Sequence, residues 1–123
     1  MKKYGETISA MPPKPKSYMI FFGSDSAVIT PEAKIELARA AEEIKAQKTS
    51  IVVCAGHTDS TGSKEHNQIL SMKRANNVTK ELVALGVDRN IIESKFYGDA
   101  DLLVKTEKGV SHPQNRRVEI MVK

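Results

Sequence analysis

The apolar run at residues 51–55, Ile-Val-Val-Cys-Ala, constrains the fold of this chain most strongly. Successive side chains of a β-strand point to opposite faces of the sheet, so a strand that is apolar at every position is suited to burial on both faces. The run therefore predicts a central strand that helices cover on at least one side. Gly56 ends the run, and the polar residues 57–63 predict a loop.

Helical patterns lie on either side of this strand in the sequence. Thr30 and Pro31 suit the N-cap and the first helical position, so a helix is expected to start there and to run to about residue 48. Its apolar residues at helical spacing are Leu37, Ala38, Ala41 and Ile44. A second helix is predicted from about residue 64 to residue 85, because Gly86 is a good C-terminal cap.

Further short patterns predict strands at residues 18–22, 91–97 and 118–122, the last with alternating apolar and polar side chains. The order βαβαββ predicts an α/β fold, a two-layer sandwich in which a mixed sheet has its helices packed on one face. The last strand is expected to return in a hairpin-like manner after the loop-like residues 99–113.

Prolines and lysines mark residues 1–16 as a flexible linker or tail, so the folded domain is expected to span residues 17–123. The formal net charge is +4, of which four lysines and one glutamate in residues 1–16 contribute +3. The remaining 15 basic and 14 acidic residues differ by only +1. A nearly neutral domain with 5% aromatic residues and no tryptophan does not favour nucleic-acid binding through phosphate contacts or base stacking.

Export and membrane signals cannot be read from the sequence. A basic start at residues 1–3 is not followed by the apolar stretch of a signal peptide, and no run approaches the roughly 18 apolar residues that a membrane span needs. If the protein is exported, we expect its signal and any membrane anchor to lie outside this chain. The single cysteine, Cys54, excludes an internal disulfide framework and a cysteine-rich metal site.

The second predicted helix carries a stripe that changes character along its length. Its C-terminal part is apolar: Val78, Leu82 and Leu85. The same stripe is polar toward the N-terminus: Arg74, Ser71 and Asn67. An arginine that points toward a core is costly unless its guanidinium is paired or open to solvent. Two interpretations remain open, a structural arginine capped by a neighbouring acid and a functional cleft at the N-terminal end of this helix.

In the functional interpretation, the loop at residues 56–62 forms the other wall of the cleft and supplies Asp59 as its acid. A carboxylate and a guanidinium that face one small cleft can bind a zwitterion, because the carboxylate accepts from an ammonium and the guanidinium donates to a second carboxylate. Asn67 can donate and accept between Asp59 and Arg74. Ligands of open α/β sheets gather at the carboxyl ends of strands, which supports this position.

The residues around this position resemble the OmpA-like domain family. The pattern TDxxGxxxxNxxLSxxRA occupies residues 58–75, and residues 85–87, 97–98 and 115–120 match as well. The resemblance covers about residues 17–123. The family includes the C-terminal domain of outer-membrane protein A, peptidoglycan-associated lipoprotein and the periplasmic part of the flagellar motor protein MotB.

The resemblance implies non-covalent binding of peptidoglycan through the diaminopimelate of the stem peptide. By its motif, Asp59 holds the ammonium and Arg74 the carboxylate of that residue. Other candidate ligand contacts are Asn67, Thr58, Ser71, Arg117 and Arg116, with Arg117 preferred to Arg116. Many members carry an aspartate shortly after the first-strand phenylalanine, whereas this chain has Ser24 and Asp25 there, so either of these or a backbone amide is the expected contact.

The resemblance further implies a periplasmic anchor without enzymatic activity or cofactor. Its parent is expected to be attached to the outer membrane or envelope and to hold it to the cell wall, with other envelope proteins as additional partners. A periplasmic anchor of a MotB-like flagellar stator is the nearest alternative.

A metal-dependent hydrolase that uses His57, Asp59 and His66 is a more distant alternative. These residues and His112 have suitable side chains for zinc, but their spacing matches no compact zinc motif. Cys54 lies inside an apolar strand pattern, where a thiol is usually inert. We therefore expect no metal site and no nucleophilic catalysis.

Overall fold

The computed structural model describes residues 16–47 and 51–122, so most of the predicted linker lies outside the described residues. The strands are β1 (Lys16–Phe21), β2 (Val52–Gly56), β3 (Ile92–Phe96) and β4 (Arg117–Val122). The helices are α2 (Pro31–Ala46), α3 (Lys64–Ala84) and the short 3-10 turns η1 (Arg89–Ile91) and η2 (Pro113–Asn115). The predicted βαβαββ order is confirmed, and β1 begins one residue before the predicted domain start.

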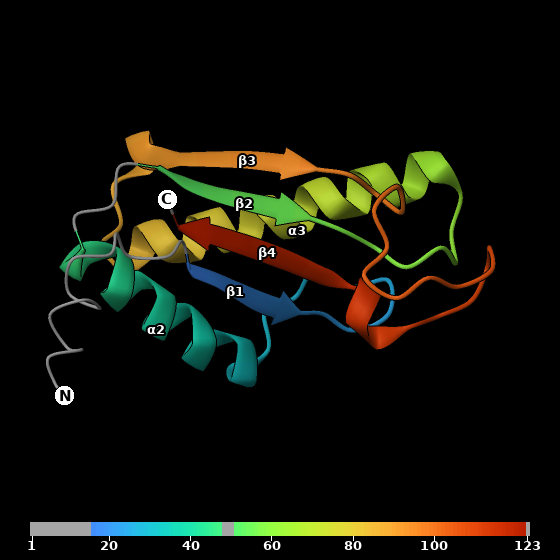
Figure 1. The fold of residues 1–123 in the computed structure, drawn as a ribbon, viewed down its shortest axis with the longest axis horizontal. Coiled ribbons are helices and arrows are strands. Elements are labelled where there is room, and N and C mark those ends of the chain that lie inside the picture. The colour runs from blue at the N-terminus through green and yellow to red at the C-terminus, as the bar shows by residue number, and fades with distance from the viewer. Residues whose placement is uncertain (1–15, 48–50, 123) are drawn as a thin grey trace, which may run out of the picture.

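The strands form one mixed sheet in the order β1-β4-β2-β3 (Figure 1). Strand β4 is antiparallel to both β1 and β2, whereas β2 and β3 are parallel. The prediction of a hairpin-like return was wrong in one respect, because β4 does not pair with β3 but lies between β1 and β2. Burial fits this place, because the residues of β4 are buried or partly buried on both faces of the sheet, whereas residues 93–96 of β3 are exposed.

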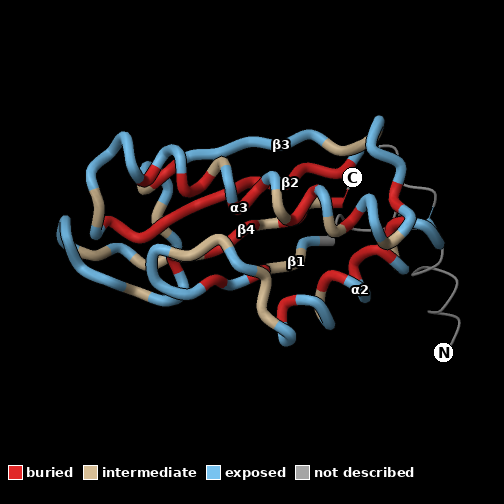
Figure 2. The backbone as a smooth tube through the Cα atoms, turned by 180° about the vertical axis from the view of Figure 1, so that it is seen from behind, coloured by how far each residue is buried: buried red, intermediate tan, exposed pale blue. Residues whose placement is uncertain are grey.

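Helices α2 and α3 pack on one face of the sheet, as predicted (Figure 1). In α2 the buried residues are Ala33, Leu37, Ala40, Ala41 and Ile44. Ala38 is exposed, so the prediction that it faces the core was wrong, and Ala40, three residues after Leu37, takes that place. Figure 2 shows the buried segments concentrated in β2, β4 and the inner sides of both helices, while most of β3 is exposed.

Local signals fix the ends of both helices. The Thr30 hydroxyl accepts a hydrogen bond from the Ala33 amide at 3.1 Å, and the Ser63 hydroxyl accepts one from the His66 amide at 3.1 Å. Gly86 follows α3 with φ of 102°, the left-handed conformation that terminates helices. No helix among residues 16–47 and 51–122 is long and apolar enough to cross a membrane.

A close approach between β2 and α3 places the candidate site. An ideal Cβ on Gly56 would lie 2.1 Å from the Ser71 carbonyl oxygen, so only glycine lets the end of β2 lie against this turn of the helix. The loop that follows Gly56 is thereby held beside the polar part of the α3 stripe.

Candidate functional site

Asp59 follows the carboxyl end of β2 and is only 4% exposed. Its Oδ1 accepts from the Thr61 hydroxyl at 2.7 Å and from the Thr61 amide at 3.4 Å. Its Oδ2 accepts from the Ser111 hydroxyl at 3.3 Å, the His112 amide at 3.3 Å and the Arg116 Nη1 at 3.2 Å. Two loops that are far apart in the sequence therefore converge on one buried carboxylate.

This arrangement keeps Asp59 ionised. Burial by itself would raise the pKa of the carboxyl, but the hydrogen bonds from Thr61, Arg116 and His112 outweigh burial and lower that pKa below its usual value of 3.8. At neutral pH the site therefore contains a fixed negative charge.

Arg74 is completely buried, with an exposed fraction of 0%. Its Nε donates to the Ser26 carbonyl at 2.8 Å, its Nη1 to the His57 carbonyl at 2.8 Å, and its Nη2 to the Gly23 carbonyl at 3.0 Å. The partners thus come from the loop after β1 and from the end of β2. The guanidinium carbon also lies 5.3 Å from the ring centroid of Phe22, a cation–π distance.

This environment answers the question that the sequence left open about Arg74. Among residues 16–47 and 51–122, the guanidinium is paired with no acid; it is closed off from solvent and donates to three backbone carbonyls. Burial lowers its pKa to about 10, an effect that the negative charge of Asp59 opposes. Arg74 therefore stays protonated at neutral pH. A guanidinium has five N–H groups, so Nη1 and Nη2 each retain one without a hydrogen-bond partner in the described part of the chain.

Arg116 and Arg117 have different surroundings. Arg116 forms an ion pair with Asp59 at 3.2 Å and donates through its Nε to the Phe22 carbonyl at 3.1 Å. Arg117, 1% exposed, instead donates to the Glu119 carboxylate at 2.7 Å. In this structure Arg116, rather than the preferred Arg117, therefore lies beside Asp59, and which of the two contacts a ligand stays a prediction. The alternation of side chains along a strand could have distinguished the two arginines. Arg116 lies on the same face of the sheet as Val118, whereas Arg117 lies on the outward face with Glu119.

Asn67, Thr58 and Ser71 also lie in this region but are committed to internal hydrogen bonds. The Asn67 amide group donates to the Gly62 carbonyl at 3.2 Å, and the Thr58 hydroxyl donates to the Asp59 carbonyl at 2.8 Å. The Ser71 hydroxyl accepts from the Gly98 amide at 2.9 Å. All three residues are buried, so in this structure they shape the wall around Asp59 and Arg74.

The first-strand loop contributes through its backbone. Ser24 and Asp25 are both exposed, and the Asp25 carboxylate lies 2.6 Å from His66 Nε2. Asp25 has φ of 50°, a left-handed conformation that aspartate tolerates. The Gly23 and Ser26 carbonyls on either side of it hold Arg74.

The histidines do not assemble a metal site. The His57 ring stacks on Tyr97 with 5.3 Å between centroids, and His66 faces Asp25. Burial, followed by the positive charge of Arg117, lowers the pKa of His57 below 6.5, so its ring is neutral at pH 7. Within residues 16–47 and 51–122, no three His, Cys, Asp or Glu side chains are grouped to hold a metal ion. Burial also raises the pKa of the Cys54 thiol to about 11, which makes it a poor nucleophile.

Sequence reasoning missed three residues that donate to Asp59, namely Thr61, Ser111 and His112. Ser111 and His112 belong to a stretch without periodicity, and a backbone amide has no side-chain signature. The chemistry that the site offers is therefore a buried anion and a buried cation close together, with Arg116 already paired to the anion.

Comparisons with known proteins show the family of this chain. The sequence model of the OmpA family matches residues 21–116. The chain is 32% identical over 117 residues to the peptidoglycan-associated lipoprotein of Legionella pneumophila, covering 95% of this chain and 65% of that protein. It is 37% identical over 103 residues to the peptidoglycan-binding protein ArfA of Mycobacterium bovis, covering 84% of this chain and 32% of that protein. The chain thus spans less than two thirds of either relative.

Solved structures show the same fold. The OmpA-like domain of FopA1 from Francisella tularensis superposes with a TM-score of 0.80 at 29% identity, covering 89% of this chain and 75% of that one. The peptidoglycan-associated lipoprotein of Burkholderia pseudomallei superposes with a TM-score of 0.78 at 27% identity, covering 85% and 89%.

Proposed function

The chain belongs to the OmpA family, and from this premise we propose that it binds peptidoglycan non-covalently through the diaminopimelate of the stem peptide. The observation that carries the proposal is the buried Asp59 carboxylate, which hydrogen bonds keep ionised beside the buried and protonated Arg74. The names of two relatives, a peptidoglycan-associated lipoprotein and a peptidoglycan-binding protein, support the same ligand.

In this proposal the two charged groups of the diaminopimelate side-chain end are recognised separately. The ammonium group takes the place of the Arg116 guanidinium at Asp59 Oδ2, and Arg116 turns toward the ligand. The carboxylate accepts from the N–H groups that Nη1 and Nη2 of Arg74 retain. Because Arg74 is covered by the loop that carries Gly23 and Ser26, binding requires this loop to move aside.

The chain would act as an anchor rather than as an enzyme, without a cofactor. We place it in the periplasm, where a parent protein attached to the outer membrane or another envelope component would be held to the cell wall.

The test is retention by purified sacculi that contain diaminopimelate. Asp59→Asn keeps the shape of the side chain but removes its charge, so the variant should lose retention while its thermal unfolding stays cooperative. Asp88→Asn is the matched control, because Asp88 caps η1 and asparagine caps equally well. Retention of Asp59→Asn at the level of the control would contradict the proposal.

A further inference from the structure

Strand β1 has an edge without a strand partner among residues 16–47 and 51–122. The Phe22 amide donates to the Arg116 carbonyl, which extends the β1–β4 register by one pair. Because hydrogen-bonded and non-bonded pairs alternate in an antiparallel ladder, Ile20 and Tyr18 also bond to β4. The backbone groups of Ser17, Met19 and Phe21 therefore point outward, toward the free edge.

Beyond its first residue, Lys16, this edge lacks the usual protection against strand addition. Natural edge strands carry prolines, bulges or charged side chains that prevent another strand from pairing. Residues 17–21 of β1, Ser-Tyr-Met-Ile-Phe, contain neither proline nor charge, and the side chain of Phe21 is 45% exposed. The opposite edge, β3, carries Glu93 and Lys95, both exposed.

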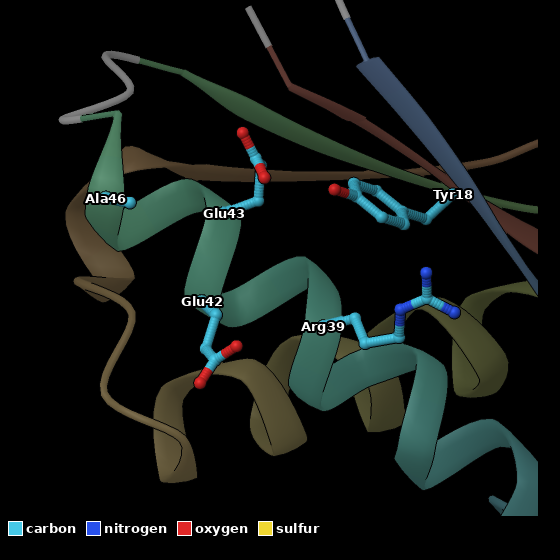
Figure 3. A pocket seen from close by; sticks show the side chains of 5 residues that line it. All are labelled: Tyr18, Arg39, Glu42, Glu43 and Ala46. Carbon is cyan, nitrogen blue, oxygen red and sulfur yellow. The ribbon is translucent and has the colours of Figure 1, made fainter.

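Two hollows run along β1 where it lies beside α2. One, of about 640 Å³, lies between Tyr18 and the C-terminal half of α2. The other, of about 500 Å³, follows Ser17 to Phe21 and reaches the first turns of α2. Both are lined by Tyr18, so we treat them together as the β1 groove. Figure 3 shows Tyr18 and Arg39 projecting into the space between β1 and α2.

The β1 groove is acidic, although the whole chain carries a net charge of +4. Its charged lining residues are Glu32, Glu36, Arg39, Glu42 and Glu43. Among the described residues of this lining, four acids and one base give a formal charge of −3. Arg39 lies 3.7 Å from Glu36, and Glu43 accepts a hydrogen bond from the Gln47 side chain. A partner in this groove therefore gains from positive charge.

We propose that the β1 groove binds an extended, basic segment of another protein, which adds to the sheet as a strand beside β1. Backbone hydrogen bonds to Ser17, Met19 and Phe21 would hold the segment, and basic side chains would face the glutamates of α2. A second copy of this chain fits less well, because pairing two β1 edges would bring two grooves of charge −3 together. The proposed binding groups are separate from the peptidoglycan site, because the outward backbone groups of Ser17, Met19 and Phe21 and the glutamates of α2 make none of the contacts described for Asp59 and Arg74.

The probe is a short fluorescein-labelled peptide in which lysine alternates with valine and threonine, titrated into the full chain and followed by anisotropy. A peptide with glutamate in place of lysine should bind at least about tenfold more weakly, which corresponds to a difference of about 1.4 kcal/mol in the free energy of binding. Amide hydrogen exchange by NMR should show new protection at Ser17, Met19 and Phe21 when the lysine peptide is present.

Met19→Pro removes an outward N–H without breaking a bond to β4, and proline is tolerated at such edge positions. It should weaken binding by about tenfold, whereas Met19→Ala, which keeps the N–H, should change binding much less. Circular dichroism is the check that both variants fold. The proposal is overturned if the lysine peptide does not bind, or if Met19→Pro binds as well as Met19→Ala. It is also overturned if the three amides are already protected without peptide, in a dimer or in the monomeric chain itself.

Discussion

Replacing Arg74 by alanine should destabilise the fold substantially, even though the residue was first singled out as a ligand contact. The substitution leaves the carbonyls of Gly23, Ser26 and His57 without their donor. A buried polar group that loses its partner costs about 1–3 kcal/mol. The variant no longer has to remove a guanidinium from water when it folds, which offsets part of the sum over three carbonyls, so we expect a loss of about 3–5 kcal/mol.

The assay is urea denaturation with linear extrapolation to water, which gives the free energy of unfolding. Arg39→Ala is the matched control, because the Arg39 side chain is 73% exposed and, within the described segments, its one ion pair is with Glu36 at 3.7 Å. We expect that variant to lose less than about 1 kcal/mol. A loss below about 1 kcal/mol for Arg74→Ala would refute the conclusion that these carbonyls depend on Arg74.

Three further predictions concern packing, pH and metals. Gly56→Ala should lower the free energy of unfolding by about 3 kcal/mol or prevent folding, because its Cβ would lie 2.1 Å from the Ser71 carbonyl oxygen. The control is Gly23→Ala, whose Cβ would lie 3.8 Å from its nearest neighbour, and it should stay within about 0.5 kcal/mol of the unchanged chain in the same denaturation assay. The folded-state pKa of His57 lies below 6.5, so the unfolded chain binds the proton more readily and stability should fall as the pH decreases below 6.5. His57→Phe should flatten that part of the stability profile, and an unchanged slope would contradict the assignment. Retention by sacculi should survive EDTA, since no metal-ligand group is present in the described segments, and a loss that zinc restores would contradict this.

Local patterns in the sequence predicted most of the fold. The caps at Thr30 and Gly86 and the apolar run at residues 51–55 each follow from short-range physics, and the structure confirms the elements they predicted. The place of β4 between β1 and β2 was not predicted, because strand pairing depends on contacts between distant parts of the chain. In the structure, β4 is better buried than β3, which agrees with its place inside the sheet while β3 lies at the edge.

The sequence allowed us to predict which side chains of the candidate site point inward, but not which backbone groups they contact. Helix periodicity predicted that Arg74 points inward, and the structure buries it completely. Its three carbonyl partners have no signature in the sequence, so the covering of Arg74 by the loop after β1 was not foreseen. Extending the alternation of β4 back by one residue would have placed Arg116 on the same face as Val118, but its contact with Asp59 depends on how distant loops meet.

Calorimetric titration of the chain with two muropeptides tests the central claim most directly. One carries diaminopimelate in its stem peptide, and the other carries lysine, which has the same ammonium group but lacks the second carboxylate that Arg74 is proposed to bind. The account predicts saturable binding of the diaminopimelate muropeptide and binding of the lysine muropeptide weaker by at least about tenfold, or about 1.4 kcal/mol. Equal affinity for the two would contradict recognition by Asp59 and Arg74 together.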